Sequence, residues 1–377
     1  MKVDLVFPDR GRAVDGIGDY TECLTAAMRL TLRVEPTFVR VRTGRQACIS
    51  VLRRRSADAV LIQYMPFSWG RWGFAPWLVL TVAVLRLTRR RTVVAIMVHE
   101  CYEDMRSVRT TLMGGWQRVQ LRLLLRMAQR RGASITRFAD QLAAAWPHLP
   151  VQRIPVSSPF AAALDAREAE RARRGWAADD MVLGTMSSGH RGQLIDHVAR
   201  AANAVAAGLG HCVLLVLGNG AVVPDRLDPR VTVVRPGFLA AQDIAPLIAA
   251  CDVYLAPYLD GVSSRRTTML AGLQQGVAIV GTKSASTDPD LLSHPALVLT
   301  DVKDVDGFAG AAATVAADAG LRAAMAAHAR ALFAERYAFS VVARMWLDHL
   351  GAGEAAPPAG AGTPIASTTS SQPAPSA

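Results

Sequence analysis

Residues 253–280 read VYLAPYLDGVSSRRTTMLAGLQQGVAIV, and this stretch decides the fold. Apolar and β-branched side chains fill 253–256 and 277–280, as in buried strands, and an amphipathic helical stretch covers 264–275. Two strands that are joined through a helix lie parallel in one sheet. The stretch therefore predicts one strand–helix–strand unit of an α/β protein.

The same alternation extends over most of the chain. It predicts strands at 3–7, 38–41, 59–63, 92–98, 151–156, 181–186, 212–217, 231–234, 253–256 and 277–280. It predicts helices at 19–31, 45–55, 74–88, 107–131, 138–146, 190–207, 242–251, 264–275, 303–318, 320–335 and 340–350. This order is typical of parallel sheets that are covered by helices on both faces.

The length of 377 residues predicts two domains, since a domain commonly has about 150 residues. We place an N-terminal domain at 1–160 and a C-terminal domain at 161–335, with the charged run DAREAERARR near the boundary. Residues 336–350 are predicted to be a helix that returns to the first domain. Residues 351–377, rich in Gly, Ala, Pro, Ser and Thr, are predicted to be a disordered tail.

Composition excludes several classes of protein. An apolar fraction of 51% excludes wholesale disorder. The 5 cysteines are scattered without a C-x-x-C pair, which excludes a disulfide scaffold or a zinc ribbon and fits a reducing cytoplasm. The longest apolar run, at 74–87, contains Arg86 and is shorter than the roughly 18 residues of a transmembrane helix.

The net charge of +11 lies in the first half of the chain. Residues 1–180 hold 29 Lys and Arg against 16 Asp and Glu, a net +13, and the remainder holds 13 against 15, a net −2. A basic excess predicts an anionic partner, either nucleic acid or a membrane surface. No nucleic-acid-binding motif accompanies the charge, so we expect no nucleic acid and favour an anionic membrane surface.

Four arginines recur at every fourth position of WQRVQLRLLLRMAQRR at 116–131: Arg118, Arg122, Arg126 and Arg130. On a helix they form one cationic stripe beside an apolar face, a pattern typical of a helix that lies on a membrane. The alternative is a solvated face of an ordinary domain helix. The first interpretation predicts a cytoplasmic protein that is peripheral at the inner face of the plasma membrane.

The candidate site lies in the loops that follow the strands, because ligands of open α/β sheets bind there. Gly16 and Gly18 precede a helix, where they present amide groups to an anion or form a plain turn. His99 follows the strand at 92–98 and is predicted to be a hydrogen-bond donor or a proton shuttle. Arg191 ends the glycine- and serine-rich loop at 184–192, where it would neutralise a phosphate.

The loop DGVSSRR at 260–266 holds the densest cluster of polar side chains. Ser264 is a plausible N-cap of the helix that follows. An Asp, a Gly, two Ser and two Arg at a helix N-terminus predict a site for a diphosphate joined to a polyhydroxylated group. The alternative is a capped helix with solvated arginines.

Together these motifs resemble the family-four (group 1) glycosyltransferases, which have the GT-B architecture of two facing Rossmann-like domains. The matching features are GIGDY at 16–20, His-Glu at 99–100, the glycine-to-basic loop that ends at 191–192, DGVSSRR at 260–266 and the glycines of GVAIVG at 276–281. Their order and spacing match from residue 1 to about residue 350. The chain most resembles a sub-branch with a DGVS-x-RR motif.

The resemblance implies a hexosyltransferase that moves a sugar from a nucleotide-diphosphate sugar to a saccharide or polyprenyl-linked acceptor with retention of configuration. It implies a role in cell-envelope or exopolysaccharide synthesis, without a metal or another cofactor. The catalytic residues that it implies are His99, Asp260 and Arg191. The donor-binding residues that it implies are Gly16, Gly18, Gly192, Gly237, Gly261, Val262, Ser263, Ser264 and Arg265, with backbone amides of 261–263 facing the donor.

One departure from the family concerns its two glutamates, which lie eight residues apart. Asp260 stands at the first position, and Thr268 stands at the second, where the family holds the ribose. We therefore expect another ribose contact and a compensating role for Arg265. The departure also leaves open a catalytically degenerate GT-B subunit that acts as a binding or scaffold protein. Less favoured are a nucleotide-sugar epimerase and a metal-dependent glycosyltransferase. The metal-dependent enzyme would need a pair of carboxylates at the end of an early strand, whereas the D-x-D strings of this sequence come late in the chain.

Overall fold

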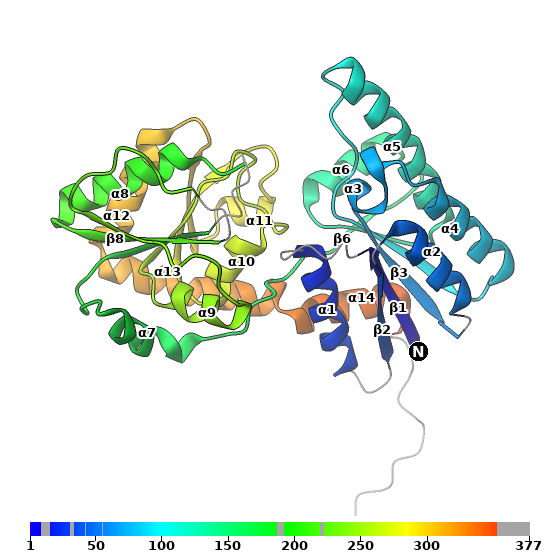
Figure 1. Cartoon of the computed structure of the whole chain (residues 1–377), viewed down its shortest axis with the longest axis horizontal. Coiled ribbons are helices and arrows are strands. Elements are labelled where there is room, and N and C mark those ends of the chain that lie inside the picture. The colour runs from blue at the N-terminus through cyan, green and yellow to red at the C-terminus, as the bar shows by residue number, and fades with distance from the viewer. Residues whose placement is uncertain are drawn as a thin grey trace, which may run out of the picture.

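The computed structural model describes residues 1–8, 16–30, 34–41, 43–54, 56–186, 192–218 and 222–352. These residues form two α/β domains that lie side by side, the first at the right of Figure 1 and the second at the left. Each domain has a six-stranded sheet in which the neighbouring strands are parallel. Residues 353–377, predicted to be a disordered tail, lie outside the described residues.

The first sheet has the strand order β2-β1-β3-β4-β5-β6. Its strands are β1 (Lys2–Pro8), β2 (Glu35–Val41), β3 (Ala59–Tyr64), β4 (Val93–Val98), β5 (Arg130–Ala133) and β6 (Gln152–Arg153). Its helices are α1 (Gly16–Arg29), α2 (Gly44–Arg53), α3 (Pro66–Trp69), α4 (Pro76–Thr88), α5 (Val108–Met127) and α6 (Thr136–Ala145), with a 3₁₀ turn at Arg71–Gly73.

The second sheet has the order β12-β11-β10-β7-β8-β9. Its strands are β7 (Val182–Met186), β8 (Cys212–Leu217), β9 (Val231–Val234), β10 (Val253–Ala256), β11 (Ala278–Lys283) and β12 (Leu297–Asp301). The remaining helices are α7 (Arg167–Arg174), α8 (Ile195–Leu209), α9 (Ala241–Ala249), α10 (Thr267–Gln274), α11 (Pro289–Leu292), α12 (Val305–Ala317), α13 (Ala319–Leu332) and α14 (Phe339–Leu350). A 3₁₀ turn at Leu164–Ala166 precedes α7, and a π-helical turn at Phe333–Tyr337 precedes α14.

Helices cover both faces of each sheet because alternate strand residues point to opposite sides. In β3, Leu61 packs in a core with Leu24 of α1. Its neighbours in β3, Val60 and Ile62, pack in a separate core with residues of α2, α4 and α5. Buried apolar side chains form both cores, which explains why the strands read as continuous apolar runs in the sequence.

The last helix, α14, packs against α1 of the first domain. Its Trp346 is fully buried beside Gly132 of β5, where a Cβ atom would lie 2.7 Å from the indole ring. Nε2 of His349 accepts a hydrogen bond of 3.1 Å from the backbone N–H of Arg131. The chain thus crosses between the domains twice. After the second crossing, α14 packs against α1 and β5 of the first domain.

The predicted helix at 107–131 is too long, and this changes the predicted arginine stripe. The helix ends at Met127, because Ala128 adopts an extended conformation and the next residues form β5 beside β4. Arg130 therefore lies on a strand and not on the stripe. Arg118, Arg122 and Arg126 remain exposed along α5. The strand β12 was also not predicted.

We predict that Trp346→Ala destabilises the protein by about 3–5 kcal/mol, the usual cost of removing a fully buried aromatic side chain. The midpoint of urea unfolding measures the change. Trp77→Ala is the matched control, because Trp77 is 51% exposed, and its substitution should change the midpoint little. Equal effects of the two substitutions would contradict the role of α14 in the core of the first domain.

Candidate active site

The loops that follow the strands of the two sheets face one another across a cleft between the domains. Two cavities lie in this cleft, and residues of both domains line each of them. The lining residues follow β3, β4, β5, β10 and β11 in the first cavity. In the second cavity they lie at or after the ends of β1, β6, β7, β8, β9 and β10. Both cavities thus lie at the carboxyl ends of the strands, where the sequence analysis placed the candidate site.

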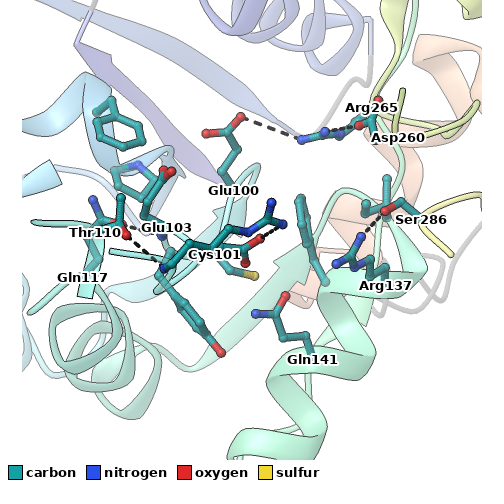
Figure 2. Close-up of a pocket in the computed structure, with 17 residues that line it drawn as sticks. Glu100, Cys101, Glu103, Thr110, Gln117, Arg137, Gln141, Asp260, Arg265 and Ser286 are labelled. Carbon is teal, nitrogen blue, oxygen red and sulfur yellow. Dashed lines mark hydrogen bonds and ion pairs between the residues drawn. The ribbon is translucent and has the colours of Figure 1, made fainter. Parts of the chain in front are cut away.

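The first cavity, here called the β4 cavity, has a volume of about 560 Å³. Its lining, drawn in Figure 2, includes Glu100, which follows β4, Arg137 and Gln141 of α6, and Asp260 and Arg265 of the second domain. Arg137 and Gln141 lie four residues apart and so share one face of α6. Neither residue was predicted from the sequence to belong to the site. Their spacing of four residues, next to charged loops, could have indicated that both face the same cavity.

Asp260 is the charged centre of the wall that the second domain contributes. Its carboxylate accepts hydrogen bonds from both Arg265 and Arg266. Burial acts to raise the pKa of Asp260, but the guanidinium groups of Arg266 and Arg265 outweigh it, and the pKa lies below its ordinary value. Arg265 also pairs with Glu100 of the first domain at 3.7 Å (Figure 2). A chain of alternating charge therefore crosses the cleft.

The backbone of the loop after β10 is largely hydrogen-bonded within the protein. The N–H of Gly261 donates to the carbonyl of Tyr258 at 2.9 Å, and that of Val262 donates to Thr282 at 2.8 Å. The prediction that these two amides face the donor is therefore wrong. Gly261 has φ +71°, and a Cβ atom would lie 2.7 Å from the backbone nitrogen of Ser284, so this turn requires glycine.

Ser264, predicted to bind the donor, takes part in the contact between the domains and lines neither cavity. Its hydroxyl donates to the carbonyl of Ser134 in the first domain at 2.8 Å, and its N–H donates to Asp288 at 2.7 Å. It is also not an N-cap, because α10 begins at Thr267. Its neighbour Ser263 is fully buried, and its hydroxyl has no hydrogen-bond partner among the described residues.

His99 lies behind the cleft and lines neither cavity. Its Nε2 lies 2.7 Å from Oε1 of Gln63, and the ring of Tyr20 packs edge-on against the imidazole. Burial lowers the pKa of His99 to about 3. The imidazole is therefore neutral at physiological pH, which favours the predicted hydrogen-bonding role over the predicted proton shuttle.

The second cavity, here called the α1 cavity, has a volume of about 900 Å³. From the first domain Asp19 and Glu22 of α1 line it, and from the second domain Thr268 does. The hydroxyl of Thr268 lies 2.7 Å from that of Tyr258. The predicted residues Gly16 and Gly237 also line this cavity, whereas the exposed ring of Phe238 beside them was missed.

The other predicted residues lie as follows. Arg191 lies outside the described residues. Gly18 is buried in the first turn of α1. The carbonyl of Gly192 accepts a hydrogen bond of 2.8 Å from the N–H of Leu259, which joins the loops after β7 and β10. Across the described ranges, no three His, Cys, Asp or Glu side chains come together as metal ligands would.

No protein-family model and no curated protein sequence matches the chain. Several solved structures resemble it over nearly its whole length. Sucrose-phosphate synthase from Thermosynechococcus elongatus is 14% identical with a TM-score of 0.68, and the match covers 94% of this chain and 100% of that one. The chain has the GT-B fold.

Two further structures share this fold. HepE from Anabaena in complex with UDP is 17% identical with a TM-score of 0.64, covering 93% of this chain and 100% of that one. A glycosyltransferase from Rickettsia africae is 10% identical with a TM-score of 0.65, and the match covers 93% of this chain and 98% of that one. The predicted fold class, two facing Rossmann-like domains of the GT-B type, is confirmed.

We predict that His99 makes the stability of the protein depend on pH. The unfolded imidazole has a pKa near 6.5, so below that pH the unfolded chain binds one proton that the folded chain excludes until about pH 3. This proton lowers the free energy of unfolding by up to about 1.4 kcal/mol for each pH unit between these values. Urea unfolding between pH 7 and pH 4.5 measures the slope.

His99→Gln removes this titration and keeps an amide that can bond to Gln63, so its slope should be shallower than that of the wild type. His148→Gln is the control for the loss of a histidine, because His148 is exposed. The same slope in all three proteins would show that His99 is not held neutral by burial.

Proposed function

We propose that the protein is a retaining glycosyltransferase that uses a nucleotide-diphosphate sugar as its donor. The observation that supports this most is the α1 cavity, which lies between the carboxyl ends of both sheets and has a volume of about 900 Å³. That volume suits a nucleotide sugar. Neighbours in fold have been solved with such ligands, among them HepE with UDP and with UDP-glucose.

The α1 cavity is the proposed donor site. Gly237 has φ +83° and leaves space at the loop after β9, where Phe238 offers an aromatic ring to a base. Thr268 stands where the resembling family has its second glutamate, and its hydroxyl is a hydrogen-bond group for the ribose. Asp19 and Glu22 add carboxylate acceptors for sugar hydroxyls from the opposite wall.

The β4 cavity, which Asp260 and Arg265 line, is the proposed acceptor site. In the proposed reaction the bond between the anomeric carbon and the diphosphate breaks, and the acceptor oxygen bonds to that carbon on the same face. The acceptor proton passes to the departing diphosphate. The protein supplies positioning and positive charge, with Arg191 proposed to face the diphosphate, so the reaction needs no metal.

The acceptor class and the cellular role follow from the charge of the first domain. We propose a saccharide or polyprenyl-linked saccharide as the acceptor, and a role in cell-envelope or exopolysaccharide synthesis at the inner face of the plasma membrane. None of the helices in the described part of the chain is both long and apolar enough to cross a membrane. We propose peripheral attachment through the basic first domain.

We predict that at least one of UDP, GDP and ADP raises the melting temperature, because a ligand of the folded state stabilises it by mass action. Thr268→Val keeps the shape of the side chain and removes its hydroxyl. It should weaken binding of that nucleotide about three- to tenfold, the range for one neutral hydrogen bond. Calorimetric titration measures the affinity, with Thr314→Val on the exposed side of α12 as the control.

Wild-type protein that binds none of the three nucleotides would favour the other candidate, a degenerate GT-B subunit that acts as a scaffold. The engaged amides of Gly261 and Val262 favour that candidate. Equal affinity of wild type and Thr268→Val would instead remove Thr268 from the ribose contact and leave the donor site in place.

We predict that Asp260→Asn lowers kcat/KM at least about tenfold, because the amide removes the negative charge that pairs with both Arg265 and Arg266. Transfer from a panel of nucleotide sugars measures turnover, with and without EDTA. Asp228→Asn is the matched control, since Asp228 pairs with Arg230 and has the same 25% side-chain exposure. Unchanged turnover in Asp260→Asn, or an absolute need for a divalent cation, would contradict the proposed mechanism.

A further inference from the structure

The outer side of the first domain carries exposed apolar side chains on two neighbouring helices. Helices α4 and α5 contact each other and pack on the same face of the sheet, at the side away from the second domain (Figure 1). Their opposite sides therefore face solvent together. Six large apolar side chains on these sides are 44–73% exposed: Trp77, Leu80 and Leu87 of α4, and Leu112, Val119 and Leu123 of α5.

An aromatic cluster lies next to this surface, before α4. Trp72 and Phe74 are exposed, and both pack against Trp116 of α5, with ring centroids 6.5 and 5.7 Å apart. Trp72 has φ +56°, a conformation that is strained for a bulky residue. Its carbonyl accepts a hydrogen bond of 2.9 Å from Gln117, which holds the strained turn. Backbone strain that keeps a tryptophan at the surface indicates a function for the exposed ring.

Positive charge without negative charge surrounds these apolar side chains. The sequence contains no Asp or Glu between Asp58 and Glu100, or between Asp104 and Asp140. The guanidinium groups of Arg45 and Arg71 lie over the rings of Trp77 and Trp72, 5.1 and 5.2 Å from the ring centroids. Along α5, three arginines lie on the exposed side: Arg118, Arg122 and Arg126.

We propose that this docking face, formed by residues 71–88 and 108–126, binds an anionic lipid surface. Tryptophan favours the boundary between headgroups and acyl chains, and arginine favours lipid phosphates, so the two residue types suit one partner. A lipid surface accepts cations at any point, which fits arginines that are spread along α5. The stripe predicted from the sequence is thus one part of a surface whose aromatic residues were not predicted.

The docking face adjoins the β4 cavity. Gln117 lines that cavity, where its Oε1 accepts a hydrogen bond of 2.8 Å from the N–H of Glu103. The same side chain donates to Trp72 in the aromatic cluster. If the proposed function holds, docking brings the acceptor cavity next to the lipid headgroups, where a lipid-linked acceptor would reach it.

The test is sedimentation of the purified full chain with vesicles, with neither donor nor acceptor present, so that its outcome is independent of the proposed enzyme activity. We expect binding to vesicles that contain phosphatidylglycerol and little binding to pure phosphatidylcholine. Salt at 1 M should release much of the protein, because it shortens the Debye length from about 10 Å at 0.1 M to about 3 Å. Wild-type protein that stays in the supernatant with both vesicles would overturn the proposal and leave the face to a protein partner.

Two variants separate the two parts of the face. Substitution of Arg118, Arg122 and Arg126 by Gln should lower the partition coefficient at least about tenfold and reduce its salt dependence. Substitution of Phe74, Trp77 and Leu80 by Ser should lower the partition coefficient and keep its salt dependence. Each variant is first checked for a melting temperature close to that of the wild type, since all six side chains are exposed.

The control substitutes Gln for Arg29, Arg330 and Arg344, which are exposed on α1, α13 and α14 outside the docking face. This control variant loses three positive charges, as the α5 variant does, and it should bind vesicles nearly as well as the wild type does. If the control weakens binding as much as the α5 variant does, net charge and not this face is responsible. If neither face variant weakens binding, the docking face is not the lipid-binding surface.

Discussion

The carboxylate of Asp288 fixes the position of the two domains at the cleft. It is almost completely buried and accepts a hydrogen bond of 2.8 Å from the N–H of Thr136 in the first domain. It accepts another of 2.7 Å from the N–H of Ser264 in the second domain. Arg153 lies 3.5 Å away and supplies the countercharge. A buried carboxylate needs such partners, so this arrangement strongly constrains the relative position of both segments.

The walls of both cavities depend on that contact. Thr136 begins α6, so the same hydrogen bond places Arg137 and Gln141 in the β4 cavity. Ser264 belongs to the loop that contains Asp260 and Arg265, which line the β4 cavity. The same loop leads into α10, where Thr268 lines the α1 cavity. One buried charge therefore positions residues of the proposed acceptor and donor sites together. The amides of Gly261 and Val262 in this loop also form hydrogen bonds within the protein. These bonds further restrict the loop and so hold its side chains in place.

The uneven charge of the chain has a structural counterpart. In the second domain, Arg265 and Arg266 of the loop after β10 are both paired with Asp260. On α4 and α5 of the first domain there are no acidic residues to pair with. The positive charge there faces outward among apolar side chains. Charge thus organises the cleft in one domain and the proposed lipid surface in the other.

The sequence by itself determined the strand–helix alternation, the parallel sheets and the strand ends at which the site lies. Apolar runs such as 212–217 and 253–256 predicted their strands to the residue, because strands that are buried on both faces have few polar positions. Helix ends and edge strands were less predictable. The short strand β5 reads as a continuation of α5, since only its pairing with β4 makes it a strand.

Tertiary structure alone decided the roles of individual site residues. The sequence pattern is the same whether the N–H of Val262 faces a ligand or donates to Thr282, and only the position of β11 settles this. Likewise, the burial of His99, which has Gln63 and Tyr20 among its neighbours, lowers the pKa of the imidazole, and the local sequence does not show that burial. Hydrogen bonds and burial join residues that are distant in the chain, and local patterns carry no record of those partners.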